Sequence, residues 1–301
     1  MNTKQLRIIL AFAVVYIVWG STYLAIRFAI ETIPTFTMAG LRFLIAGLIL
    51  YVYCISRGWT QGLTTRHWVN SLIVGGLLLA GGNGSVVWAE HYVPSGPASL
   101  FVAMVPWWMV IIEWIFDKQK KPNAWTSAGL SLGLLGVMIL VLPAWKGQLH
   151  PVGTIVLLLA SLWWAMGSIY AKRTNLPTSV FTATAMNMMC GGAILLIFSF
   201  SQGEWSGIQW SHMSEKSVLA FVYLIVFGAL LGFSVYIWLL NEVSSSLVST
   251  FAFVNPVVAV FLGWAFNSEP ITAHTLIAAT VIIAAVVLII FGQKFKSISI
   301  R

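Results

Sequence analysis

The stretch Phe101-Val-Ala-Met-Val-Pro106 occurs twice in this chain, because it returns 150 residues later as Phe251-Ala-Phe-Val-Asn-Pro256. The similarity extends to both sides in the same register, and ten positions between residues 82 and 116 are identical after the shift. Each copy places a proline inside a long apolar run, where proline removes a helical hydrogen bond and bends the chain. We interpret the two copies as equivalent, broken helices of an internal repeat.

The composition is that of a protein embedded in lipid. Hydrophobic residues make up 59% of the 301 residues and charged residues 8%, whereas a soluble domain carries about 25% charged residues. Runs of about 20 apolar residues, long enough to cross a bilayer, recur from end to end. Each run must satisfy its own backbone hydrogen bonds in lipid, so helices are expected.

The apolar runs predict an all-α membrane protein with ten transmembrane helices. The first run resembles a signal peptide, but it is too long and no cleavage site follows it, so we count it as the first span. The predicted spans lie near residues 7–27, 35–56, 68–89, 96–116, 124–142, 152–171, 179–200, 217–240, 246–266 and 273–292.

The loop charges predict the orientation of the chain. With a cytoplasmic N-terminus, twelve basic residues fall on the inside and three on the outside, which satisfies the positive-inside rule. Both termini are therefore predicted to be cytoplasmic. The net charge of +8 is explained by these loops, and no nucleic-acid partner is expected.

The ten spans divide into two repeats, residues 1–142 and residues 150–292, with five spans each. Because five is an odd number, the second repeat enters the membrane from the opposite side. Inverted repeats are typical of secondary transporters, in which the substrate binds near the midplane between the repeats.

Five motifs occur in order along the chain: Trp19-Gly-Ser-Thr-Tyr23, Leu41-Arg-Phe43, Gly82-Asn-Gly84 with Ala89-Glu-His91, Val93-Pro-Ser-Gly96, and Val254-Asn-Pro-Val-Val258. Together they resemble the EamA-type drug/metabolite transporters, and most closely their YedA-like branch. The resemblance implies a ten-span exporter of small metabolites or drugs in the bacterial inner membrane, with a central cavity lined by spans 1, 3, 4, 6, 8 and 9. It does not give the substrate, because members of the family differ widely.

Polar and aromatic residues near the middle of the spans are the candidates for a substrate cavity. A second repeat, shifted by 147 residues, places Ser21 and Tyr23 opposite Ser168 and Tyr170. Helix spacing puts these residues on shared faces, which serve either helix packing or a cavity wall. The full set of cavity candidates is Tyr16, Trp19, Ser21, Tyr23, Asn83, Trp107, Trp163, Ser168, Tyr170 and Asn255.

Two pairs of adjacent tryptophans lie in mid-span, Trp107 with Trp108 and Trp163 with Trp164. Neighbouring residues on a helix point about 100° apart, so at most one of each pair faces the cavity. We predict that Trp107 and Trp163 do so. Such a wall suits aromatic or amphipathic cargo.

The prolines and the charged residues within spans have several interpretations each. Pro106 and Pro256 are either hinges or static kinks. Arg42 either reaches the outer interface, braces a neighbouring helix, or binds a carboxylate. Glu90 and Glu113 are either hydrated interface carboxylates or, in a proton-driven exporter, the groups that bind the proton.

No motif of an ATPase, a zinc protease or an α/β-hydrolase is present, so we expect neither enzymatic activity nor a cofactor or metal. The leading prediction is a secondary exporter of an amino-acid-like, aromatic or amphipathic small molecule that works by alternating access. The alternatives are a nucleotide-sugar or organic-phosphate exchanger, and a non-transporting membrane enzyme or scaffold. The expected partners are a small-molecule substrate and membrane lipid. The sequence leaves open a monomer or a homodimer.

Overall fold

The computed structural model describes residues 3–93, 95–116, 122–142, 150–207, 213–267 and 272–298. Within these ranges every regular element is a helix, and ten helical spans are long and apolar enough to cross a membrane. The predicted all-α fold with ten spans is therefore confirmed. Several basic side chains that contribute to the predicted charge asymmetry lie outside the described part of the chain: Lys118, Lys120, Lys121, Lys294, Lys296 and Arg301.

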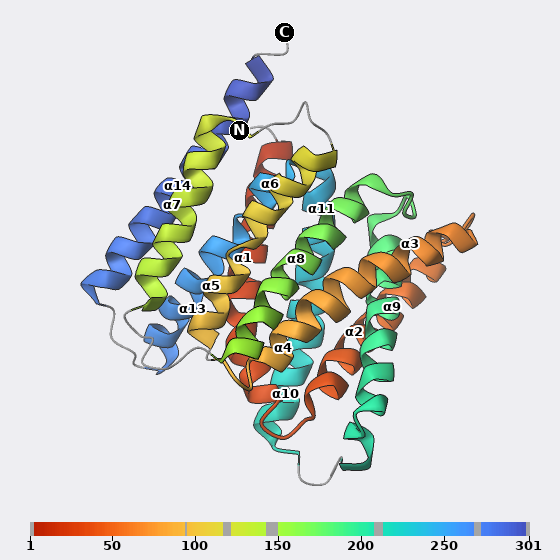
Figure 1. The fold of residues 1–301 in the computed structure, drawn as a ribbon. Helices are drawn as coiled ribbons and strands as arrows, with labels where there is room; N and C mark the ends of the chain where they lie inside the picture. Colours follow the sequence, from red (N-terminus) through yellow and green to blue (C-terminus); the bar gives the residue numbers. More distant parts are fainter. Residues whose placement is uncertain are drawn as a thin grey trace.

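The first repeat contains two continuous spans, two interrupted spans and a final continuous one (Figure 1). The third span changes from α-helix to π-helix and back, and the fourth is broken by a turn. The elements are α1 (Thr3–Ala29), α2 (Thr35–Ser56), α3 (Thr65–Gly75) with η1 (Gly76–Gly84) and α4 (Ser85–Ala89), α5 (Ser95–Val102) with α6 (Val105–Phe116), and α7 (Ala124–Val141).

The second repeat follows the same plan. Its third span again contains a π-helix, at the place that corresponds to η1, and its fourth span is again broken by a turn. The elements are α8 (Pro151–Arg173), α9 (Val180–Ser201), α10 (Glu215–Tyr223) with η5 (Leu224–Phe233) and α11 (Ser234–Glu242), α12 (Ser245–Val248) with α13 (Phe251–Asn267), and α14 (Ala273–Ile298). A short 3₁₀ helix, η3 (Glu204–Gly207), follows α9.

The spans of the two repeats pack against each other in corresponding pairs. Equivalent spans pair with each other, α2 with α9 and α7 with α14, while α1 packs on η5 and α13 as α8 packs on η1 and α6. Helix α1 begins at the end of the bundle at which α14 ends (Figure 1). We call this the terminal end, and the opposite one the far end, where α8 begins beside the loop after α4.

Glycines allow the closest helix contacts. A Cβ atom on Gly47 of α2 would lie 2.8 Å from the backbone nitrogen of Met189 in α9, and one on Gly192 of α9 would lie 2.6 Å from the backbone nitrogen of Leu44. In lipid, helices associate through such close backbone approach, because burial of apolar surface adds little driving force there. These contacts fix the α2–α9 pair at the edge of the bundle.

The breaks in the fourth and ninth spans are not placed alike relative to their prolines. Pro106 lies in the first turn of α6, directly after the turn at residues 103–104. Pro256 lies inside the continuous helix α13, and the break comes more than one turn earlier, at residues 249–250. The π-helices were not predicted. Such segments are rare and are frequent at functional sites.

Candidate functional site

A cavity of about 770 Å³, part of it open to solvent, lies between the two repeats. Its wall is formed by spans 1, 2, 3, 4, 6, 8 and 9, so span 2 joins the six spans implied by the family resemblance. From α1 the lining residues run from Trp19 to Ile26, toward the far end, and from α8 they end at Trp164. The cavity therefore occupies the half of the bundle away from the termini.

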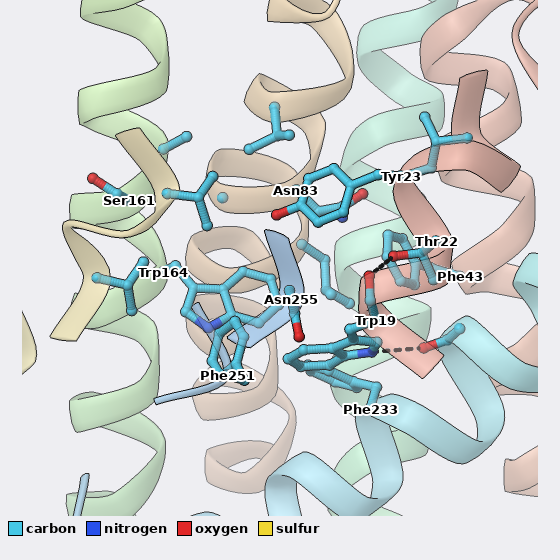
Figure 2. Close-up of a pocket in the computed structure, with 18 of the residues that line it drawn as sticks. Trp19, Thr22, Tyr23, Phe43, Asn83, Ser161, Trp164, Phe233, Phe251 and Asn255 are labelled. Atoms are coloured by element: carbon cyan, nitrogen blue, oxygen red, sulfur yellow. Dashed lines mark hydrogen bonds between the residues drawn. The ribbon is translucent and has the colours of Figure 1, made fainter. Parts of the chain in front are cut away.

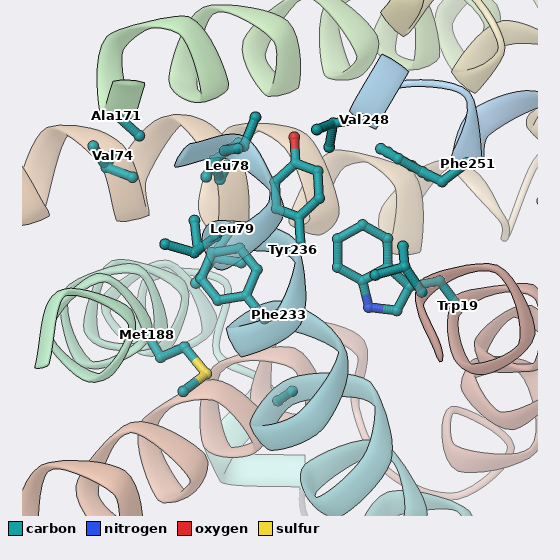
Figure 3. Close-up of a cluster of buried hydrophobic side chains, with 14 of the residues drawn as sticks. Trp19, Val74, Leu78, Leu79, Ala171, Met188, Phe233, Tyr236, Val248 and Phe251 are labelled. Atoms are coloured by element: carbon teal, nitrogen blue, oxygen red, sulfur yellow. The ribbon is translucent and has the colours of Figure 1, made fainter. Parts of the chain in front are cut away.

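Four aromatic rings close the cavity toward the terminal end. We call this group, Trp19, Trp164, Tyr236 and Phe251, the ring cluster. The centroid of the Trp19 ring lies 5.5 Å from that of Trp164, 4.9 Å from that of Tyr236 and 5.0 Å from that of Phe251. Three of these rings form the aromatic floor in Figure 2, and Figure 3 shows Tyr236 between Phe233 and the Trp19–Phe251 pair.

Each tryptophan of the ring cluster packs on a glycine of the other repeat. A Cβ atom on Gly232 in η5 would lie 2.5 Å from Nε1 of Trp19, and one on Gly82 in η1 would lie 2.9 Å from a ring carbon of Trp164. Gly82 and Gly232 are the first identical pair of the 150-residue repeat. Each π-helix thus provides a glycine against which a tryptophan ring of the other repeat packs.

Hydrogen bonds hold the ring cluster in place. The Trp164 Nε1–H donates to the Tyr236 hydroxyl over 3.0 Å, and the same hydroxyl lies 2.6 Å from the Ser168 hydroxyl. The Trp19 Nε1–H donates to the carbonyl of Gly228 over 3.2 Å. The polar atoms of these three side chains are therefore hydrogen-bonded, and the apolar faces of the rings pack against one another beside the cavity.

Arg42 is a buried cation in the cavity wall, with 3% of its surface exposed. Its Nη2 donates to the Asn83 Oδ1 over 2.6 Å, which braces α2 against η1, and its Nε has no hydrogen-bond partner among the described residues. Burial excludes the prediction that the side chain reaches the outer interface. Bracing is what the structure shows, and a free donor remains.

Asn255 is the second polar group in the cavity wall that lacks a partner. Its residue is 2% exposed, and its Oδ1 accepts no hydrogen bond from the described residues. In Figure 2 the Asn255 amide lies between Asn83 and the rings of the aromatic floor.

The two glutamates lie outside the cavity wall. Glu90 follows α4 at the far end, where it attracts Arg27 and Arg42 electrostatically without an ion-pair contact to either. Glu113 accepts a 2.6 Å hydrogen bond from the Ser245 hydroxyl, which joins α6 to α12 near the terminal end. Whether either binds a proton stays a prediction.

The structure brings five of the predicted residues together in the cavity and places six others elsewhere. Trp19, Tyr23, Arg42, Asn83 and Asn255 line the cavity. The remaining six have other neighbours: Tyr16 bonds to Thr250, Ser21 to Tyr223, Ser168 to Tyr236 and Tyr170 to Asn70, while Trp107 packs beside α7 and α13, and Trp163 packs against Gly81.

Several lining residues were not among the predicted ones. Trp164 occupies the place predicted for its neighbour Trp163, and Phe233 of η5 also lines the cavity. Phe251 opens the second copy of the repeated stretch, so the repeat itself pointed to it. Trp108, rather than Trp107, turns toward α8, where its Nε1–H donates to the Ser161 hydroxyl over 3.1 Å.

Comparison with known proteins matches most of the chain. A model of the EamA-like transporter family matches twice, over residues 6–142 and 151–291. The uncharacterized inner membrane transporter YedA of Escherichia coli (strain K12) is 38% identical over 281 residues, which span 92% of this chain and 89% of that protein. The uncharacterized transporter YoaV of Bacillus subtilis (strain 168) is 26% identical over 92% of this chain and 94% of that protein. A solved crystal structure shares the fold, with a TM-score of 0.75 at 17% identity over 95% of this chain and 97% of that one.

Proposed function

This chain belongs to the EamA-like transporter family, and on that basis we propose that it exports a small organic molecule by alternating access as a secondary active transporter. It is a multi-pass transporter of the bacterial inner membrane. The cargo proposed is a small metabolite or drug of amino-acid-like, aromatic or amphipathic character. The observation that carries the proposal is the cavity between the repeats, which is closed toward one end by the ring cluster.

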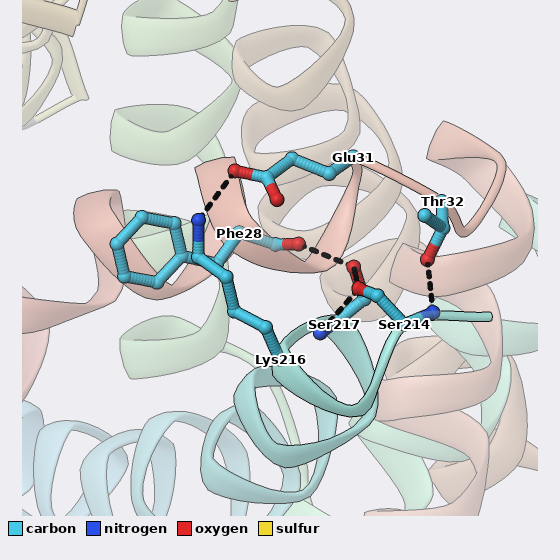
Figure 4. Close-up of polar contacts among 6 residues, drawn as sticks. All are labelled: Phe28, Glu31, Thr32, Ser214, Lys216 and Ser217. Carbon is cyan, nitrogen blue, oxygen red and sulfur yellow. Dashed lines mark hydrogen bonds and ion pairs between the residues drawn. The ribbon is translucent and has the colours of Figure 1, made fainter.

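The contacts at the far end favour a motion of span groups drawn from both repeats. The Lys216 ammonium lies 2.7 Å from the Glu31 carboxylate, and the Ser217 hydroxyl donates to the carbonyl of Phe28 over 2.7 Å (Figure 4). A second ion pair, Lys4 to Glu242 at 2.9 Å, joins the same two spans at the terminal end. Spans 1 and 8 are thus tied at both ends and would move together.

The equivalent pair, spans 3 and 6, is tied at the terminal end. The Tyr170 hydroxyl donates to the Asn70 side chain over 3.0 Å, and the Asn70 amide donates to the carbonyl of Asn175 over 2.7 Å. In the proposed cycle these two groups of spans tilt against each other. The ring cluster then separates while the far end closes, as expected when inverted repeats exchange conformations.

Counterflow into proteoliposomes tests the proposal. Liposomes preloaded with one compound from a panel of aromatic acids, amines, amides and sugar nucleotides should take up a labelled trace of the same compound if it is carried. Counterflow restricted to sugar nucleotides would favour a nucleotide-sugar exchanger instead. We do not expect this result, because Arg42 is the one charged residue among the described lining residues and a nucleotide carries several negative charges. No counterflow of any member, with lipid-directed catalysis instead, would reject a transporter of this kind.

Export further requires the proposed orientation, with both termini in the cytoplasm and the cavity of this structure open toward the periplasm. A green fluorescent protein fused to the C-terminus should fluoresce, and alkaline phosphatase at the same place should be inactive. Fusions after Ala29, at the far end of α1, should give the reverse pattern. Active phosphatase at the C-terminus would contradict the orientation and the direction of transport.

A further inference from the structure

The Arg42 guanidinium lacks an anionic partner in this structure. Among the described residues no carboxylate forms an ion pair with it, and its Nε has no hydrogen-bond partner. A cation in the interior of a membrane protein is costly unless it is paired. Its planar donors match the two oxygens of a carboxylate.

Glu90 does not fill this role. Its carboxylate attracts Arg42, but it also attracts Arg27, it makes no ion-pair contact with either, and it does not line the cavity. The donors of Arg42 that Asn83 leaves free are therefore available to an acid group that enters the cavity.

The Asn255 side chain requires a hydrogen-bond donor from a ligand, whereas Arg42 requires an acceptor. Its unpaired Oδ1 accepts hydrogen bonds, so a buried ligand that satisfies it must carry an N–H or O–H donor. In Figure 2 the rings of Trp19 and Phe251 lie below it and the Trp164 ring lies beside it, while Asn83, which binds Arg42, lies above it. Three groups thus follow one another along the cavity. Arg42 can bind an acid group, the Asn255 side chain can accept from a hydrogen-bond donor, and the ring cluster can pack against an aromatic ring.

We propose that Arg42 and Asn255 determine the specificity of this cavity, and that it takes a small aromatic carboxylate with a hydrogen-bond donor between its acid group and its ring. The acid group of the ligand accepts hydrogen bonds from the Arg42 guanidinium, its donor group donates to the side-chain Oδ1 of Asn255, and its ring packs against the ring cluster. This inference rests on the proposed function, since it assumes that the cavity binds the cargo.

Binding to the full-length protein in lipid nanodiscs, measured by calorimetry, tests the inference with three related probes. They are 3-phenyllactate, 3-phenylpropanoate, which lacks the donor, and 3-phenyllactamide, which lacks the charge. We expect 3-phenyllactate to bind about tenfold or more tightly than either of the other two, since each lacks one buried hydrogen-bonded group.

Two substitutions should remove one preference each. Arg42→Gln should abolish the preference for acid over amide and leave the preference for the hydroxyl, and Asn255→Leu should do the reverse. Arg27→Gln is the matched control, because it removes a nearby cation that does not line the cavity, and it should retain both preferences. If Arg42→Gln fails to fold, Arg42→Lys should keep the preference for the acid but weaken it, because an ammonium lacks the planar fork.

The inference is overturned if none of the probes binds, if the wild type binds the amide as tightly as the acid, or if Arg42→Gln retains the preference for the acid. Failure of the proposed function has a different signature. Intact binding preferences without counterflow would reject transport but keep the assignment of the two residues. Counterflow of compounds that do not compete with 3-phenyllactate would keep transport and reject the assignment.

Discussion

Trp164→Ala is expected to lower the kcat/KM of transport by about tenfold or more, whereas Trp163→Ala changes it by less than about twofold. The Trp164 ring lines the cavity, packs on Gly82 and lies 5.5 Å from the Trp19 ring. Its removal would leave a void in the floor and free the Tyr236 hydroxyl from one partner. Trp163 packs against Gly81, outside the cavity wall.

The measurement is initial counterflow in proteoliposomes, normalised to the amount of folded protein and taken below saturation. The two variants remove the same side chain from adjacent positions, so differences in composition or expression do not explain a difference between them. Trp164→Phe should recover part of the loss, because it restores a ring to the floor. Greater damage from Trp163→Ala would show that the cargo follows a route other than this cavity.

Gly75→Ala is expected to destabilise the fold by about 3 kcal/mol and to lower the Tm by roughly 10 °C. A Cβ atom at Gly75 would collide with the backbone carbonyl of Asn187 and lie 2.7 Å from the backbone nitrogen of Gly191. Backbone atoms of a packed helix cannot rotate away as a side chain does, so α3 and α9 would have to separate. Thermal unfolding of the purified protein in detergent measures the loss.

The neighbouring Gly76→Ala is the control. A Cβ atom there would lie 3.3 Å from Cδ1 of Ile194, the flexible end of a side chain. We expect no loss of stability, and a gain of about 0.5 kcal/mol is consistent with the lower entropy of the unfolded chain. Equal Tm values for the two variants would mean that α3 and α9 do not approach as closely as the structure has them.

The number and type of the spans could be predicted from the sequence because lipid leaves few choices. A run of apolar residues in a bilayer must be helical and must have a certain length. The 150-residue repeat also identified equivalent spans. The π-helices could not be predicted, since a local change in hydrogen bonding leaves no periodic signal when nearly every residue is apolar.

The helix face on which a residue lies was easier to predict than its level along the bundle axis. Trp19 and Tyr23 lie on the predicted face of α1 and line the cavity, but Tyr16, one turn earlier on that face, lies on the other side of the ring cluster and bonds to Thr250. Helix spacing gives the face of a residue and not the level at which partner helices close the path. Which of Trp163 and Trp164 faces the cavity depends on how α8 packs against η1, and the sequence alone did not predict that packing.

The ring cluster also has a consequence for the energy supply of the cell. The six ring pairs of the cluster have centroids 4.9 to 6.2 Å apart, so the rings pack against one another at the terminal side of the cavity. Protons cross a membrane readily along chains of water, and an apolar, aromatic partition interrupts such a chain. We therefore expect this conformation of the protein not to conduct protons, which proteoliposomes with an imposed pH gradient would show as an unchanged rate of proton leak.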